Sequence, residues 1–145
     1  SLGKTVLVLD GDVVRKELHT HLGFTPEDIK ENNRLISEIC KRERTNYNFI
    51  LVPIISPFRE DRAKARQSMG EDFHEIFINC PLEECLRRDP KGNYKKALSG
   101  EIDNFIGIHK DVPYEPPNNP NLVLNTNLEE PDVSVQRILK MLDSN

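Results

Sequence analysis

Two carboxylates, Asp10 and Asp12, stand where an aliphatic run of the sequence ends. Residues 6–9 before them are uninterrupted aliphatic side chains, which predicts a short strand buried on both faces. Open α/β sheets bind ligands at the carboxyl ends of their strands, so both aspartates are candidates for binding or acid–base chemistry. The alternative is structural, because Asp-Gly is common turn chemistry and an aspartate here could cap a helix that starts near Val13.

Segments typical of strands and of helices alternate after this point. Apolar runs predict strands over residues 6–9, 49–55, 74–79 and 122–124. Caps and apolar stripes predict helices over residues 25–44, 59–67, 81–86 and 94–99, and from about 129 to the end. Pro53 favours a sheet position that needs no amide donor. The alternation predicts an α/β fold with a mainly parallel sheet and right-handed crossovers.

Length and composition describe a globular chain. We expect 145 residues to form a single domain, 1–145, in which the Gly-, Asn- and Pro-rich stretch within about 87–120 forms a lid. No apolar run approaches the roughly 20 residues that span a bilayer, and no signal peptide is recognisable. We therefore expect a cytoplasmic protein that does not bind membranes. A net charge of -4 with well-mixed signs argues against a nucleic-acid partner. The three cysteines have no zinc-site spacing and are interpreted as reduced.

Gly3-Lys4-Thr5 ends like a phosphate-binding loop. Such a loop needs a further glycine five positions earlier, a strand before it and a helix after it. Here a strand is predicted after the threonine, so a turn that leads into that strand is the preferred interpretation.

Longer stretches occur in an order and at spacings that together resemble one known family. They are Leu9-Asp10-Gly11-Asp12 with Arg15, Leu22-Gly23-Phe24, Glu31-Asn32 with Arg34, Ile55-Ser56-Pro57-Phe58-Arg59-Glu60-Asp61-Arg62, Arg88-Asp89-Pro90-Lys91-Gly92-Asn93-Tyr94 and Phe105-Ile106-Gly107. The chain resembles the adenylylsulfate kinases over nearly its whole length. The resemblance implies a three-layer α/β fold of the P-loop kinase type. It also implies phosphoryl transfer from ATP, with Mg²⁺, to the 3'-hydroxyl of adenosine 5'-phosphosulfate in sulfate assimilation.

The resemblance also implies roles for individual residues. Asp12 and Arg15 would contact the adenylylsulfate, and Asp10 or Asp12 would place the hydroxyl or the metal. The remaining substrate contacts would come from Phe24 stacking on the adenine, Asn32, Ile55, Ser56, and Lys91 with Phe105 in the lid. Arg88 and Lys91 would serve the ATP side of the lid, and the family's serine intermediate would correspond to Ser56, although direct in-line transfer needs no covalent stop. From the sequence alone Phe24 could equally be a core anchor. The candidate cations for the anionic substrate and the migrating phosphoryl group, each of which could instead be a solvated surface charge, are Arg15, Arg59, Arg62, Arg88 and Lys91.

Four departures from the family pattern bear on activity. Val13, Ile29 and Leu35 stand where the family has Asn, Arg and Arg, and an aliphatic side chain at position 29 cannot replace a bidentate anion donor. The family's strand, Gly-rich phosphate loop and helix upstream of residue 6 are not found in this sequence. We therefore expect phosphate transfer by these residues to be poor or absent.

Three hypotheses follow from the matches and the departures. The first is an adenylylsulfate kinase, and the second is a noncatalytic domain that binds a nucleotide sulfate or has a regulatory role. The third is a kinase of the same fold that acts on another small nucleotide. The resemblance makes a homodimer and a fused or bound ATP sulfurylase plausible partners.

Overall fold

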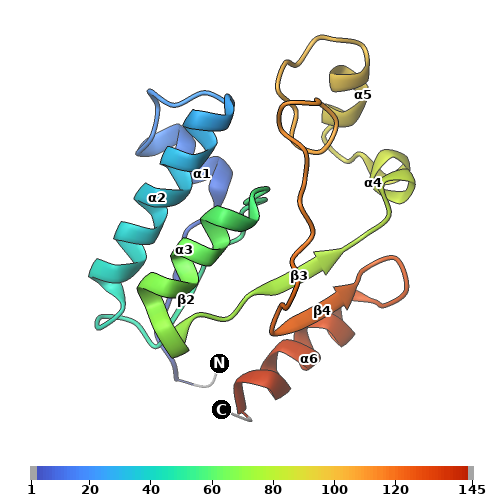
Figure 1. Cartoon of the computed structure of the whole chain (residues 1–145). Coiled ribbons are helices and arrows are strands. Elements are labelled where there is room, and N and C mark those ends of the chain that lie inside the picture. The colour runs from blue at the N-terminus through green and yellow to red at the C-terminus, as the bar shows by residue number, and fades with distance from the viewer. Residues whose placement is uncertain (1–2, 144–145) are drawn as a thin grey trace. The chain divides into compact units, whose positions relative to one another are not determined.

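The computed structural model describes residues 3–143. In chain order it contains β1 (Val6–Val8), α1 (Gly11–Glu17), α2 (Pro26–Glu43), β2 (Phe49–Leu51), α3 (Arg59–Met69), the 3₁₀ turn η1 (Gly70–Asp72), β3 (Ile76–Asn79), α4 (Leu82–Arg88), α5 (Asn93–Leu98), β4 (Leu122–Asn125) and α6 (Pro131–Asp143) (Figure 1). The predicted alternation of strands and helices is confirmed. The chain divides into two compact units, one of Ser1–Phe73 with Asp103–Pro116 and one of His74–Ile102 with Pro117–Asn145. The prediction of a single domain stays a prediction.

The first unit is built on the parallel pair β1 and β2, in which Leu7 lies opposite Ile50. Strand β2 is shorter than the predicted strand over 49–55. The chain turns after Leu51, where Ile54 N–H donates to the Val52 carbonyl at 3.0 Å, and Pro53 has no amide to continue a ladder. The core cluster contains Leu9, Val14 and Ile36, which brings β1, α1 and α2 together.

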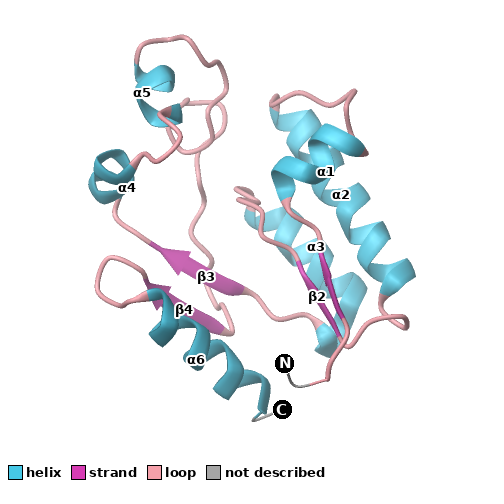
Figure 2. Ribbon diagram, turned by 180° about the vertical axis from the view of Figure 1, so that it is seen from behind, coloured by secondary structure: helices cyan, strands magenta, loops and turns pink. Residues whose placement is uncertain are grey.

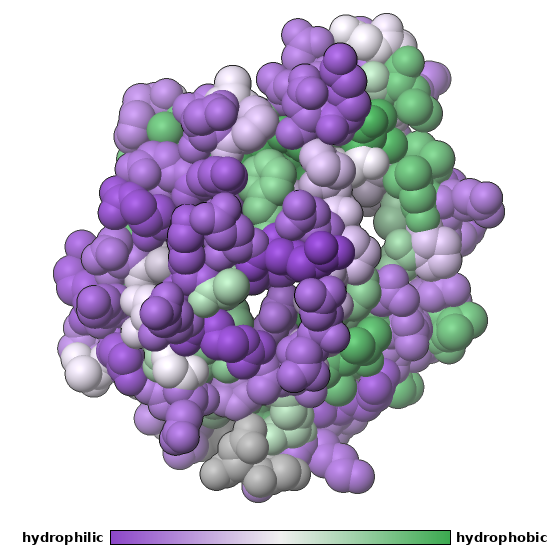
Figure 3. All heavy atoms as spheres, in the orientation of Figure 1, coloured by the Kyte–Doolittle hydropathy of each residue, from purple (hydrophilic) through white to green (hydrophobic). Residues whose placement is uncertain are grey.

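Helix α2 begins as its sequence predicts. The Thr25 hydroxyl accepts a hydrogen bond from Asp28 N–H at 3.2 Å, and Pro26 occupies the first turn. Helix α3 packs beside α2 (Figure 1). Figure 3 shows a mostly hydrophilic surface over these two helices on the side that faces the viewer. Helix α2 contributes Ile36, Ile39 and Cys40 to the packing of the unit.

The second unit is built on the parallel pair β3 and β4, in register from Ile76 opposite Leu122 to Asn79 opposite Asn125. The Asn79 side-chain amide donates to Asn125 Oδ1 at 2.8 Å and joins the ends of the two strands. Helix α6 lies along β4 (Figure 2), and Leu124 is only 1% exposed. The described strands thus form two separate two-stranded parallel sheets, each with its own packed helices.

No helix in the described part of the chain is both long enough and apolar enough to cross a membrane.

Candidate functional site

The turn between β1 and α1 holds the Asp10-Gly11-Asp12 sequence. Asp10 Oδ1 accepts hydrogen bonds from the backbone N–H groups of Asp12 at 2.9 Å and Val13 at 3.2 Å, so Asp10 caps α1. Gly11 N–H donates to the Pro53 carbonyl at 3.2 Å, and a Cβ at this position would lie only 3.0 Å from Ile54 Cγ2. The structural interpretation of Asp10 is therefore confirmed. Its cap leaves Asp12 exposed on the first turn of α1, at the end of the strand.

Arg15 and Phe24 form a stacked pair. The guanidinium carbon lies 4.5 Å from the centroid of the Phe24 ring, and Nη1 donates to the Gly23 carbonyl at 2.6 Å. Burial lowers the pKa of Arg15, and the nearby Asp28 carboxylate acts in the opposite direction. Phe24 is 52% exposed, so it is a surface platform and not a core anchor.

Asn32, on the first half of α2, bonds to a histidine from the segment after α1. His19 Nδ1 lies 2.9 Å from Asn32 Oδ1, and both residues are buried. The sequence offered no pattern that links them, because they are 13 positions apart.

The next residue of α2, Asn33, reaches the segment after β2. Its Nδ2 donates to Asp61 Oδ2 at 3.2 Å and, more weakly, to Ser56 Oγ at 3.4 Å. Burial raises the pKa of the Asp61 carboxyl, while the hydrogen bond from Asn33 opposes that shift. Ser56 has a φ of +43°, a left-handed conformation that is uncommon without glycine, and Ile55 before it is 58% exposed. Adjacent amides on one helix therefore connect to His19 in the segment after α1 and to Ser56 and Asp61 in the segment after β2.

Two arginines of α3, Arg59 and Arg62, bind backbone carbonyls. Arg59 Nε donates to the Pro116 carbonyl at 2.7 Å. Arg62 donates to the Ser56 carbonyl and the Glu115 carbonyl, each at 2.6 Å. These bonds attach the end of the segment 103–116, which also carries the half-buried Phe105, to the start of α3. Both arginines were expected as anion donors, and the structure uses these groups to hold that segment.

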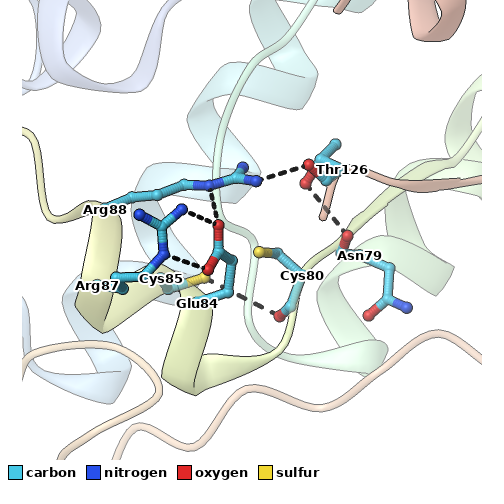
Figure 4. Close-up of polar contacts among 7 residues, drawn as sticks. All are labelled: Asn79, Cys80, Glu84, Cys85, Arg87, Arg88 and Thr126. Atoms are coloured by element: carbon cyan, nitrogen blue, oxygen red, sulfur yellow. Dashed lines mark hydrogen bonds and ion pairs between the residues drawn. The ribbon is translucent and has the colours of Figure 1, made fainter. Parts of the chain in front are cut away.

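Arg88 and Lys91 belong to the second unit. Figure 4 shows Arg87 and Arg88 both turned to Glu84, and Arg88 also donates to the Thr126 carbonyl at 2.9 Å. Hydrogen bonds from the two arginines lower the pKa of Glu84 to about 2. After α4, Asp89 accepts from the backbone N–H groups of Tyr94 and Lys95, each at 3.1 Å, which begins α5 and bounds the turn that carries Lys91.

The predicted site residues are distributed over both units. The first unit carries all but two of them: Asp10, Asp12, Arg15, Phe24, Asn32, Ile55, Ser56 and Phe105. Sequence reasoning missed His19, Asn33 and Asp61 as members of this network. A polar residue on the buried stripe of α2, at Asn33 between Ile29 and Ile36, was the one signal available.

The departures from the family pattern have different structural contexts. Ile29 is 1% exposed and fills the interior, so it offers no surface to a ligand. Val13 is 49% exposed on α1, and Leu35 is half-buried on α2. Among residues 3–143 no group of three or more His, Cys, Asp or Glu side chains could hold a metal ion.

Comparisons with known proteins point to a single family. A family model described as adenylylsulphate kinase matches residues 1–125. The adenylyl-sulfate kinase of Clostridium kluyveri is 46% identical over 142 residues, which is 98% of this chain and 70% of that protein. The adenylyl-sulfate kinase of Gloeothece citriformis is 52% identical over 136 residues, or 94% of this chain and 76% of that protein.

Solved structures agree with the sequence comparisons. The Mycobacterium tuberculosis APS kinase CysC, solved in complex with AMPPNP and APS, superposes with a TM-score of 0.90 at 42% identity. The match covers 97% of this chain and 82% of that one. The α/β fold with parallel strands is thus the fold of these kinases.

Proposed function

Because this chain belongs to the adenylylsulfate kinase family, we propose that it binds adenosine 5'-phosphosulfate at the surface formed by α1 and the start of α2. The reaction of the family transfers the γ-phosphoryl group of ATP to the 3'-hydroxyl of that nucleotide. These residues provide the side of the enzyme that receives the phosphoryl group.

The observation that carries this proposal is the pair of Arg15 and Phe24. An exposed aromatic ring offers a π-face on which a base can stack, and a guanidinium beside it supplies a fixed cation for an anionic group. The guanidinium carbon lies 4.5 Å from the ring centroid and is held by the Gly23 carbonyl, so the pair is organised before ligand arrives. This combination suits a nucleotide that carries a charged phosphosulfate.

Each remaining residue has a role that follows from its position. Asp12 follows the capped turn, and we assign it to orient the 3'-hydroxyl and to accept its proton during transfer. Asn32 donates a hydrogen bond to the nucleotide, while Ile55 and Ser56 border the phosphosulfate. Ser56 forms no covalent intermediate. Phe105 borders the nucleotide from the segment 103–116 of the same unit. In the second unit, Arg88 holds the turn that carries Lys91 through Glu84.

ATP is the phosphoryl donor of the family, and we infer that it is used with Mg²⁺. The protein's usual share of a magnesium site is one or two carboxylates, with phosphate and water oxygens completing the octahedron. Asp12, a carboxylate exposed on the first turn of α1, fits that share. The ion would supply charge neutralisation at the transferring phosphoryl group.

The second candidate function is noncatalytic binding of a nucleotide sulfate. Ile29 favours it, because the side chain is 1% exposed where the family pattern has an arginine that reaches the substrate. On this second account the protein binds adenylylsulfate and releases ADP slowly or not at all.

A coupled assay for ADP release, run beside calorimetric titrations with adenylylsulfate and with MgATP, tests this account. Saturable adenylylsulfate binding with turnover supports the kinase, and binding without turnover supports the noncatalytic domain. AMP and ADP binding as tightly as adenylylsulfate would indicate a kinase for another small nucleotide. Absence of adenylylsulfate binding would overturn the proposed site.

The assembly and location of the protein are further proposals. A hexameric APS kinase from Thiobacillus denitrificans and the bifunctional enzyme NodQ of Rhizobium tropici are both similar to this chain, at 26% and 49% identity. The hexameric relative supports self-association of this chain, and the bifunctional relative supports its association with a second enzyme. The homodimer, the ATP sulfurylase partner and the cytoplasmic location stay expectations. Light scattering of the purified chain, alone and with a sulfurylase, measures both associations.

A further inference from the structure

We propose that His19 is a positioning residue that fixes the side-chain amide of Asn32 with its Nδ2 group toward the bound nucleotide. The identity of that nucleotide rests on the proposed function. The orientation of the amide, with Oδ1 toward His19, rests on the contacts around His19 alone.

The backbone holds His19 in place. Its N–H donates to the Val14 carbonyl at 3.0 Å, and its carbonyl accepts from Leu22 N–H at 3.0 Å. The residue is only 6% exposed, so its ring has little freedom to turn away. Helix α2 fixes the other partner, Asn32, which is 3% exposed.

The chemistry of the contact sets the direction of the hydrogen bond. His19 Nδ1 lies 2.9 Å from Asn32 Oδ1. A side-chain carbonyl oxygen can only accept, so the proton must be on Nδ1 of the imidazole. The bond therefore selects the Nδ1–H tautomer of His19 and uses the acceptor end of the amide.

The donor end of the amide remains available. Asn32 Nδ2 has no hydrogen-bond partner among residues 3–143. The only completely buried side-chain N or O atom without a partner in that range is Ser134 Oγ, so Asn32 Nδ2 retains contact with solvent. A fixed N–H donor of this kind matches acceptor oxygens of a phosphate, a sulfate or a ribose. It does not match a hydrogen-bond donor of the ligand.

Substitutions at His19 test the direction of the bond. In His19→Asn the amide Nδ2 takes the place of the imidazole Nδ1 and still donates, so we expect the Kd for adenylylsulfate to change by less than about threefold. His19→Asp offers only acceptors and turns Oδ1 of Asn32 to the ligand, and we expect the Kd to rise at least about tenfold. His19→Leu removes the donor without adding charge, and its Kd for adenylylsulfate should lie between those of the other two variants. His21→Asp, at an exposed neighbouring histidine, is the matched control for the added charge.

A spectroscopic readout separates positioning from stability. Nitrogen NMR of the ligand-free chain should show the Nδ1–H tautomer for His19, and Asn32→Leu should remove its hydrogen-bond shift while thermal unfolding is followed in parallel. The Nε2–H tautomer, or equal Kd values for His19→Asn and His19→Asp, would overturn the inference and leave the proposed function standing. If the wild-type chain fails to bind adenylylsulfate, the proposed function fails together with the assignment of the ligand.

Discussion

The guanidinium of Arg15 is stacked on the ring of Phe24, with 4.5 Å between its central carbon and the ring centroid. The cation comes from the last turn of α1 and the aromatic ring from the loop before α2. Two neighbouring segments of the first unit thus place an anion-binding guanidinium against an aromatic ring on which a base can stack. This relationship leads directly to the first prediction.

Replacing Phe24 by leucine should weaken binding of adenylylsulfate by about tenfold, because stacking of a base on an aromatic ring contributes about 1–3 kcal/mol. Phe24 is 52% exposed, so we expect the free energy of unfolding to change by only about 0.5 kcal/mol or less. Calorimetric titration and urea denaturation measure the two effects. Leu18→Ala, at an exposed residue of the same region, is the control and should leave the Kd unchanged.

Restoring an arginine at position 29 should not restore an anion site. Ile29 is 1% exposed, and an unpaired charge buried there should cost about 3–5 kcal/mol of stability. Ile29→Leu keeps the apolar volume and should cost less than about 1.5 kcal/mol. A folded Ile29→Arg variant of normal stability that binds adenylylsulfate more tightly would refute this placement.

The cap formed by Asp10 should be measurable as stability. We expect Asp10→Ala to lower the free energy of unfolding by about 1 kcal/mol. Asp10→Asn should keep most of the stabilisation that the cap provides. Urea denaturation of the two variants gives the comparison. Equal losses for both would mean that the carboxylate charge, and not the hydrogen bonds to the first turn of α1, is what the fold needs.

The backbone of Ser56 is strained by its φ of +43°. Ser56→Ala and Ser56→Gly both remove the hydroxyl, so their difference isolates the conformational cost. We expect the glycine variant to be more stable than the alanine variant by about 1 kcal/mol. No difference in denaturation midpoints would show that this conformation costs the protein nothing.

The buried Asp61 should make stability depend on pH. Burial raises the pKa of its carboxyl in the folded state above the ordinary value, so the folded chain holds this proton more tightly than the unfolded chain. Its contribution is complete below the unfolded pKa and is lost as the pH rises through the folded pKa. We expect Asp61→Asn, whose amide oxygen can still accept from Asn33, to remove that dependence. Urea denaturation across the acidic range tests this, with Glu71→Gln, at an exposed carboxylate, as the control.

The local pattern of the sequence predicted where the elements lie, but the expectation that the first strand is buried on both faces was wrong, because Val6 and Val8 are 46% and 55% exposed. Aliphatic runs identified the strands. The N-cap Thr25, followed by Pro26, marked the start of α2 as observed. Strand β2 was overestimated because residues 52–55 continue the apolar run, although Pro53 and the turn at Ile54 end the ladder. Periodicity records which side chains are apolar, whereas the length of a strand depends on hydrogen-bond partners elsewhere in the chain.

The partners of the site residues were harder to predict. His19 and Asn32 are 13 positions apart, and Asn33 and Asp61 are 28 apart, so no helical or strand spacing connects either pair. The sequence identified Arg62 as a cation, but only the fold shows that the side chain binds the carbonyls of Ser56 and Glu115. Contacts of this kind arise from packing between elements, which one sequence does not encode locally.

The most direct test of the account is a calorimetric titration of the 145-residue chain with adenylylsulfate, compared with AMP and repeated on Arg15→Gln. The account predicts saturable binding of adenylylsulfate that is tighter than binding of AMP, with most of that preference lost in Arg15→Gln. Equal binding of the two nucleotides by the wild-type chain, or a preference that survives in Arg15→Gln, would contradict the placement of the substrate site at Arg15 and Phe24.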